Sequence, residues 1–263
     1  MESVAQYQLH LQQISDLFLI NGGYLDNPGL YTGEMGLALF FARYARFTQN
    51  ELYADFCYDL LDRVKRKIYK ETSINYKAGL AGIGAVIEYL VQNDYFEADT
   101  DDILEDFDNR IFFTYNLSNL PVDQIADIGY YALWRLSGNS ALKDATIKNV
   151  LSLVIEIIDD WNGKQQMTHP VLSFFSSENR NILFGNTMRQ YWLQLCRQNK
   201  PYFLKEEAFT VFSDKITKND FLNNRFLPLG IKDGLAGWGL SVLTRIDGDD
   251  SWLALFPNDL QPE

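Results

Sequence analysis

The feature that most constrains this chain is a pair of glycines, three residues apart, at the start of an apolar segment. The pair occurs in "GEMGLALFF" (33–41), "GLAGIGAVI" (79–87) and "GLAGWGLSV" (234–242), with weaker copies in 125–136 and 183–195. Successive copies start about 45 to 60 residues apart, which is the spacing of helical-hairpin repeats. Glycine costs a helix about 1 kcal/mol relative to alanine, so each recurring glycine needs a structural or functional reason.

The rest of the chain has the pattern of helices. Apolar residues recur at helical spacing in almost every segment, and alternating patterns typical of strands are scarce. In "NELYADFCYDLLDRVKRKI" we expect one apolar face, formed by Leu52, Phe56, Leu60 and Val64. Stretches rich in turn-forming residues separate the segments, at 21–29, 70–79, 116–121 and 224–234. The pattern predicts an all-α fold built from helical hairpin repeats.

Two phosphate-binding explanations for the glycines fail. "GLAGIG" has the glycine order of a dinucleotide-binding fingerprint reversed, no strand precedes it, and Glu88 follows too closely to reach a ribose. A P-loop is excluded because the chain contains no Gly-Lys-Ser or Gly-Lys-Thr sequence. We therefore expect the glycines to omit side chains so that a neighbouring backbone can approach the start of the helix.

Composition limits the partners and the compartment. The 263 residues carry a net charge of −12, from 35 acidic and 23 basic residues, which argues against nucleic acid or a membrane surface as partner. A basic peptide is a compatible partner. Cys57 and Cys196 each lie in an apolar helical run, as expected for buried thiols in a reducing compartment. Because the N-terminal sequence resembles no signal peptide and no apolar run is long enough to span a membrane, we expect a cytoplasmic protein.

"GLYTGEMGLALFF" and the recurring "GLAG-x-G" resemble the lanthionine synthetase C-like (LanC-like) family, the cyclases that close thioether rings in ribosomal peptides and their relatives. The resemblance is specific at 29–41, 79–90 and 230–243, whereas 138–225 matches only in repeat rhythm. It implies an (α/α) toroid, a ring of helical hairpins with glycine-rich loops at one mouth. On this basis we expect residues 1–263 to form a single LanC-like domain.

The resemblance also implies where zinc ligands would lie. The family's cyclases hold zinc with a cysteine in one loop and a Cys-His pair in another. The matching positions here carry Leu183 and Phe184 in "NILFGN", and Gln124 in "VDQIADIG", none of which suits zinc. The histidines, His10 and His169, do not adjoin a cysteine. We therefore expect no metal and no cofactor, and we favour a buried Cys196 over a Cys196–His169 nucleophile.

Without zinc, chemistry would depend on acids and aromatics near the glycine loops. The candidate catalytic acids are Glu34, Asp127 and Asp233, which by repeat position fall near one end of the ring. A pair of carboxylates can act as general acid and base, but acids at helix starts also serve as caps. The candidate ligand-binding aromatics are Tyr31, Tyr76, Tyr130 and Trp238. Core packing is the alternative role for these, and the expected role of Trp134, Trp192 and Trp252.

Three functions follow, in order of preference. The first is a LanC-like protein without the cyclase site, which binds a peptide or small ligand as an accessory protein or pseudoenzyme in peptide modification. The second is a metal-free enzyme with glycosidase-like acid–base chemistry in the toroid cavity. The third is a cyclase whose metal ligands come from elsewhere. The sequence does not decide the oligomeric state. It also does not decide between an enzyme and a binding protein.

Overall fold

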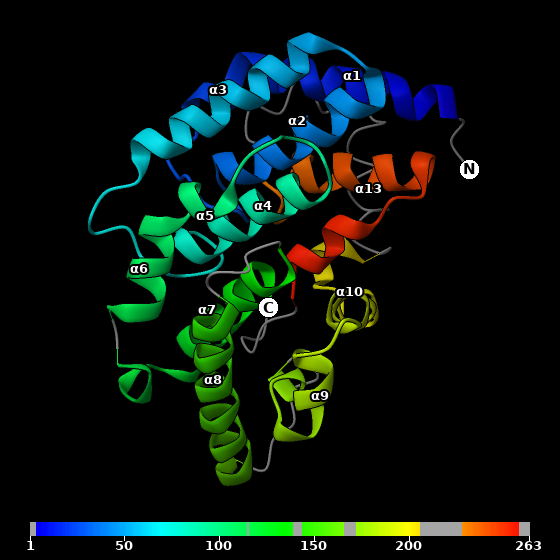
Figure 1. The fold of residues 1–263 in the computed structure, drawn as a ribbon. Coiled ribbons are helices and arrows are strands. Elements are labelled where there is room, and N and C mark those ends of the chain that lie inside the picture. Colours follow the sequence, from blue (N-terminus) through cyan, green and yellow to red (C-terminus); the bar gives the residue numbers. More distant parts are fainter. Residues whose placement is uncertain (1–3, 115, 139–143, 166–171, 206–227, 258–263) are drawn as a thin grey trace. The chain divides into compact units, whose positions relative to one another are not determined.

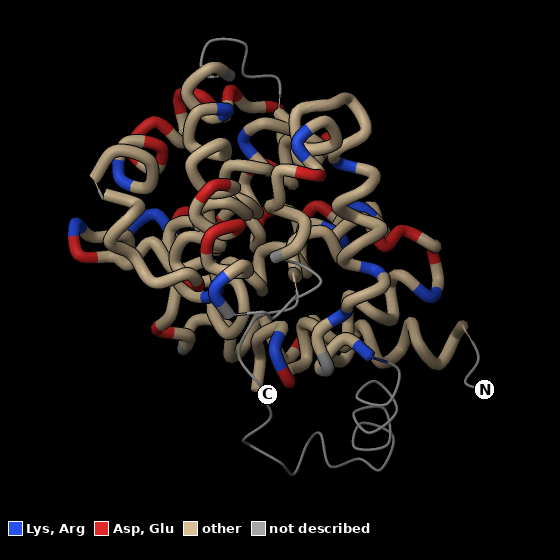
Figure 2. Tube along the Cα trace, turned by 90° about the horizontal axis from the view of Figure 1, so that it is seen from below, with Lys and Arg blue, Asp and Glu red and all other residues tan. Residues whose placement is uncertain are grey.

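Helices account for every regular element in the part of the chain that the structure describes (Figure 1). The structure is a computed structural model that describes the chain except residues 1–3, 115, 139–143, 166–171, 206–227 and 258–263. The predicted all-α class is confirmed. None of the described helices is both long enough and apolar enough to cross a membrane. Acidic and basic positions are interspersed along the trace (Figure 2).

The chain divides into two compact units, each made from two segments of sequence. Unit 1 comprises Met1–Thr72 and Tyr202–Asp250. In it, α2 packs against both α3 and α13, and α1 packs against α13. The elements of unit 1 are α1 (Val4–Asn21), η1 (Gly22–Tyr24), α2 (Glu34–Thr48), α3 (Glu51–Lys67), η5 (Tyr202–Leu204) and α13 (Leu235–Asp247).

Unit 2 comprises Ser73–Pro201 and Ser251–Glu263. Here α7 packs between α4 and α8, and α10 packs against η6. Its elements are α4 (Leu80–Gln92), α5 (Thr100–Ile103), α6 (Glu105–Phe113), η2 (Leu117–Asn119), α7 (Val122–Ser137), α8 (Asp144–Gln165), η3 (Leu172–Phe174), η4 (Ser177–Asn179), α9 (Arg180–Leu183), α10 (Met188–Gln198) and η6 (Ser251–Leu255). The expectation of one domain over 1–263 stays a prediction.

In the pairs α2–α3 and α7–α8, a helix that is buried on nearly all sides precedes one that is buried on one side only. The glycine-led helices α2, α4 and α13 are buried along most of their length, and so is α7. The helices α3, α8 and α10 instead alternate buried and exposed positions. This alternation is what a hairpin repeat requires, because one helix of each pair lines the core and the other covers it.

The apolar face predicted for α3 is wrong at its first turn. The residues that pack inward are Tyr53, Cys57, Leu60 and Val64, whereas Leu52 is 55% exposed. A spacing of four residues turns 40° beyond a full helical turn at each step, so the predicted set drifts around the helix. The observed spacing of four, three and four keeps one face toward α2.

Aromatic side chains fill both cores. In unit 1, Phe18, Phe40 and Phe41 contact one another with ring centroids 5.2 to 6.0 Å apart. The three tryptophans expected in the core, Trp134, Trp192 and Trp252, are at most 3% exposed, which confirms their packing role.

Candidate functional site

The glycine loops share one backbone geometry, which occurs three times. The first amide of each following helix donates a hydrogen bond to a carbonyl seven residues earlier. The distances are 2.9 Å from Glu34 N to Asn27 O, 2.9 Å from Leu80 N to Ser73 O and 2.9 Å from Leu235 N to Pro228 O. Each loop therefore folds back over the start of its own helix and occupies an amide that would otherwise lack a partner.

This geometry explains the first glycine of each pair. A Cβ atom on Gly33, Gly79 or Gly234 would lie 2.2, 2.1 or 2.3 Å from a backbone carbonyl oxygen. A Cβ atom on Gly36 or Gly237 would lie 2.3 or 2.2 Å from another. No side chain fits at such distances. The expectation of a closely approaching backbone is confirmed, and that backbone is the helix's own preceding loop.

In unit 1 two of these loops pair with each other. We call residues 27–33 and 228–234 the paired glycine loops. The carbonyl oxygen of Tyr31 accepts hydrogen bonds from the amides of Ile231 and Lys232, both at 2.8 Å. The pairing leaves Thr32, Lys232 and Asp233 exposed at the tip. The pairing thus holds both loops in place, and their exposed tip forms a polar surface with one positive and one negative side chain.

Asp233 lies at this tip in a left-handed backbone conformation, with φ of 52°. Few residues other than glycine adopt this region, and aspartate is one of those that tolerate it best. Backbone strain of this kind is concentrated at functional sites. Of the three candidate acids, Asp233 is the exposed one.

Glu34 is fully buried at the start of α2. Its Oε1 accepts hydrogen bonds from Arg63 Nε at 2.8 Å and Arg63 Nη2 at 2.5 Å, and its Oε2 lies 3.2 Å from Lys67 Nζ. Arg63 also donates to the Gly22 carbonyl and Lys67 to the Leu25 carbonyl. Glu34 therefore links α2 to α3 and, through Arg63 and Lys67, to the segment that precedes α2. These contacts explain why Glu34 is buried, and no catalytic role is needed to explain it.

Asp127 lies in α7 and is 7% exposed. Its Oδ2 accepts a hydrogen bond from Asn75 Nδ2 at 3.3 Å. The Oδ1 atom of Asn75 in turn accepts from the amides of Lys77 and Ala78. Asp127 thus supports the glycine loop that precedes α4. Catalytic roles for Glu34, Asp127 and Asp233 stay predictions, and the contacts of the first two give those roles no support.

The four candidate ligand-binding aromatics lie in the cores. Tyr31, Tyr76, Tyr130 and Trp238 are 4%, 2%, 3% and 4% exposed. The rings of Tyr76 and Tyr130 meet edge to face with centroids 5.4 Å apart, and Tyr31 meets Phe203 at 5.7 Å. Their contacts are those of packed core residues, so a ligand-binding role stays a prediction.

Both cysteines are buried thiols, as predicted. Cys57 Sγ donates to the Ala38 carbonyl at 3.3 Å, and burial raises the pKa of Cys57 to about 12. Burial also raises the pKa of Cys196, which is 1% exposed. A zinc ligand or a nucleophile must be a thiolate, and these environments oppose its formation.

The remaining donors do not fit the zinc site implied by the resemblance. Leu183 is fully buried, and His10 packs in unit 1 with its ring centroid 6.1 Å from that of Trp238. His169 lies outside the described residues. Among the residues that the structure describes, no three His, Cys, Asp or Glu side chains lie together as a metal site would require.

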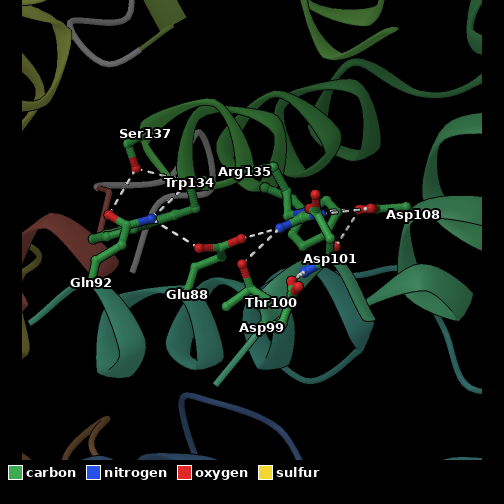
Figure 3. Close-up of polar contacts among 10 residues, drawn as sticks. Glu88, Gln92, Asp99, Thr100, Asp101, Asp108, Trp134, Arg135 and Ser137 are labelled. Carbon is green, nitrogen blue, oxygen red and sulfur yellow. Dashed lines mark hydrogen bonds and ion pairs between the residues drawn. The ribbon is translucent and has the colours of Figure 1, made fainter. Parts of the chain in front are cut away.

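Sequence reasoning missed a buried ionic network in unit 2 (Figure 3). The fully buried Arg135 of α7 binds Asp108 with two hydrogen bonds, at 3.0 and 2.9 Å. It also pairs with Asp101 at 2.6 Å and with the fully buried Glu88 of α4. The signal for it was a charged residue inside each of two apolar helices. The network joins α4, α5, α6 and α7.

Burial controls the pKa of two acidic groups in this network, and ion pairing controls that of Arg135. It raises the pKa of Glu88, although hydrogen bonds from Gln92 and the Arg135 charge oppose the shift. Burial also raises the pKa of Tyr131, whose hydroxyl donates to Asp108 at 2.7 Å. Burial alone would lower the pKa of Arg135, but the Asp108 hydrogen bonds and the surrounding negative charges raise it instead. Arg135 thus stays charged, whereas burial makes Glu88 easier to protonate than an exposed glutamate.

Comparison with protein-family models identifies a family for this chain. The family model described as "Lanthionine synthetase C-like protein" matches residues 24–185, which is more than half of the chain. The match includes two of the three glycine loops, the Arg135 network and the Leu183–Phe184 position. Searches of curated proteins and of solved structures found no match.

Proposed function

Because this chain belongs to the lanthionine synthetase C-like family, whose fold is the (α/α) toroid, we propose that it is a member without the zinc-dependent cyclase site. In this proposal it binds a peptide or a small ligand and serves peptide modification as an accessory protein or pseudoenzyme. Its partner is a peptide or small molecule rather than nucleic acid or a membrane, and its compartment is the cytoplasm.

The state of the cysteines supports this proposal most strongly. Zinc promotes thioether formation by binding a substrate thiolate, and the metal itself is held by protein thiolates and imidazoles. In this chain Cys57 and Cys196 are packed in apolar surroundings that raise both pKa values. The resemblance sets Leu183 and Phe184 at the position of the family's Cys-His pair. We therefore derive no cyclase step for this protein.

The tip of the paired glycine loops is the surface that we propose for ligand binding in unit 1. Thr32, Lys232 and Asp233 are exposed there on a backbone held by the two Tyr31 hydrogen bonds. A surface held in place before binding loses little conformational entropy when the ligand binds. Its lysine and aspartate offer one cation and one anion to the charged and polar groups of a peptide.

Titration with a fluorescently labelled peptide encoded beside this gene tests the proposal. We expect saturable binding that weakens roughly 5- to 50-fold in Lys232→Glu and in Asp233→Lys, because each change reverses one charge at the proposed surface. Asp160→Lys, an exposed aspartate of α8, is the matched control and should bind as the parent does.

Two results would contradict the proposal. Loss of the peptide's free thiols, shown by alkylation followed by mass spectrometry, would establish a cyclase, because thioether closure leaves the peptide mass unchanged. Binding that is unchanged in both loop variants would place the ligand elsewhere.

A further inference from the structure

We propose that two copies of this chain associate through α3, with the two helices side by side and antiparallel. The contact line is a stripe of exposed residues on α3, which we call the α3 stripe: Glu51, Asp55, Tyr58, Asp62 and Lys65. Their spacing of four, three, four and three residues is that of the contact line between two paired helices. The buried residues of α3 lie on the opposite side, against α2.

The order of charges along the stripe selects the antiparallel orientation. With a two-fold axis at residue 60, Asp55 of one copy faces Lys65 of the other, and Tyr58 faces Asp62. Each pair joins a donor to an acceptor, and the symmetry makes each pair twice. Asp62 also pairs with Arg66 of its own helix, so the Tyr58 hydroxyl would share this carboxylate with Arg66. An axis at Tyr58 would instead bring Asp55 close to Asp62, which opposes two negative charges. The chosen register is therefore the one that its charges favour.

The ends of the helix favour the same orientation. Glu51 begins α3, and Lys65, Arg66 and Lys67 lie in its last turn. In an antiparallel pair the acidic first turn of one copy lies near the basic last turn of the other, and the two helix dipoles are opposed. A parallel pair would set acidic ends together and basic ends together.

Exposed apolar surface supports a partner at this face. Leu52 and Tyr58 are 55% and 54% exposed on α3, and Tyr69, just beyond its end, is 65% exposed. Tyr58 lies on the α3 stripe, where an antiparallel copy would cover it, and Leu52 follows Glu51 in the first turn of the helix. The apolar burial adds to the charge pairing and does not depend on it.

The same contacts predict a weak dimer. Exposed ion pairs contribute little individually, and one pair of helices buries less area than a standard stable interface. Asp59 lies beside the two-fold axis, where it approaches its own copy and opposes association. We therefore expect a dissociation constant on the order of 10⁻⁴ M, with detectable dimer in concentrated solution.

Sedimentation equilibrium of the full chain over a range of concentrations tests this proposal. We expect a reversible monomer–dimer equilibrium that weakens about tenfold or more in Asp55→Lys and in Lys65→Asp, because each opposes like charges twice. The double variant Asp55→Lys/Lys65→Asp should recover the parent dimer. Asp160→Lys is the control for the change in net charge, and circular dichroism checks that each variant is folded.

Cross-linking tests the register. In Tyr58→Cys/Asp62→Cys the two new cysteines face each other across the axis, so mild oxidation should give a covalent dimer. The native Cys57 and Cys196 are buried and should not compete. A chain that stays monomeric at every concentration overturns the proposal. So does a dimer that no α3 substitution weakens, or a monomer that binds a basic peptide through this stripe instead.

Discussion

A single glycine shows how closely this fold is packed at the residue scale. A Cβ atom at Gly84 in α4 would lie 2.5 Å from Tyr131 Cε2 and 3.3 Å from Phe107 Cδ1. The Tyr131 ring cannot move freely because its hydroxyl is bonded to Asp108. We expect Gly84→Ala to destabilise the protein by about 1–3 kcal/mol, as measured by urea unfolding.

Gly163 in α8 is the matched control, since nothing lies within 4 Å of the position that its Cβ would take. There the same substitution should stabilise the protein by about 0.5–1 kcal/mol through helix propensity and a smaller unfolded-state entropy. Equal effects at the two sites would contradict the packing described for α4.

The thiols give a second prediction at this scale. Because Cys57 and Cys196 are buried with raised pKa values, neither should react with a thiol reagent in the native protein at pH 8. Both should react once urea unfolds the chain. Absorbance of the released thiolate follows the reaction, and rapid modification of the native protein would show that a cysteine is accessible and reactive.

At the scale of elements, Glu88 links the stability of the α4–α7 group to pH. Burial raises the pKa of Glu88 in the folded protein above its ordinary unfolded value of about 4.3. The folded state therefore holds this proton to higher pH than the unfolded state does. The resulting stabilisation is complete below the unfolded pKa and is lost as pH rises through the folded pKa.

Glu88→Gln removes this titration while an amide oxygen remains for Arg135. The free energy of unfolding of the parent minus that of Glu88→Gln should fall as pH rises from about 4 toward 7. Urea unfolding of both proteins at several pH values gives this difference. A difference that rises with pH would mean that attraction to Arg135, rather than burial, controls the carboxyl group.

Some elements could be predicted from the sequence because their causes are local. The helices follow from apolar periodicity, and the glycine pairs indicated close backbone approach at three helix starts. The carbonyl seven residues back was not predictable, because the glycines show that a backbone approaches but not which one. The predicted apolar face of α3 was wrong at its first turn because residues at a regular spacing of four drift around a helix and do not form one face.

Contacts between distant residues account for what the sequence did not show. Glu34 meets Arg63, and Arg135 meets Glu88 and Asp108, only after the helices have packed. Glu34, a candidate catalytic acid, forms an ion pair with Arg63 of α3. The four candidate ligand-binding aromatics are buried in the cores. The exposed polar tip at Asp233 is the one candidate position that tertiary packing left open to solvent.

At the scale of the whole molecule, the described part of the chain is all-α, and different residues stand at the zinc positions that the family resemblance implies. Family membership rests on the match over residues 24–185. The absence of the cyclase site is our proposal, and it concerns the donors Cys57, Cys196 and His10 together with His169, which lies outside the described residues. Helix packing and the glycine loops account for the observed fold of the described residues.

Metal analysis of the purified chain tests this central claim most directly. The protein is expressed with zinc in the medium, dialysed, and measured for bound metal by mass spectrometry and for its Tm with and without zinc. We predict no stoichiometric zinc and no zinc-dependent rise in Tm, because a metal that binds only the folded state would stabilise it. Stoichiometric zinc that is lost in Cys196→Ser or His169→Ala would contradict the account.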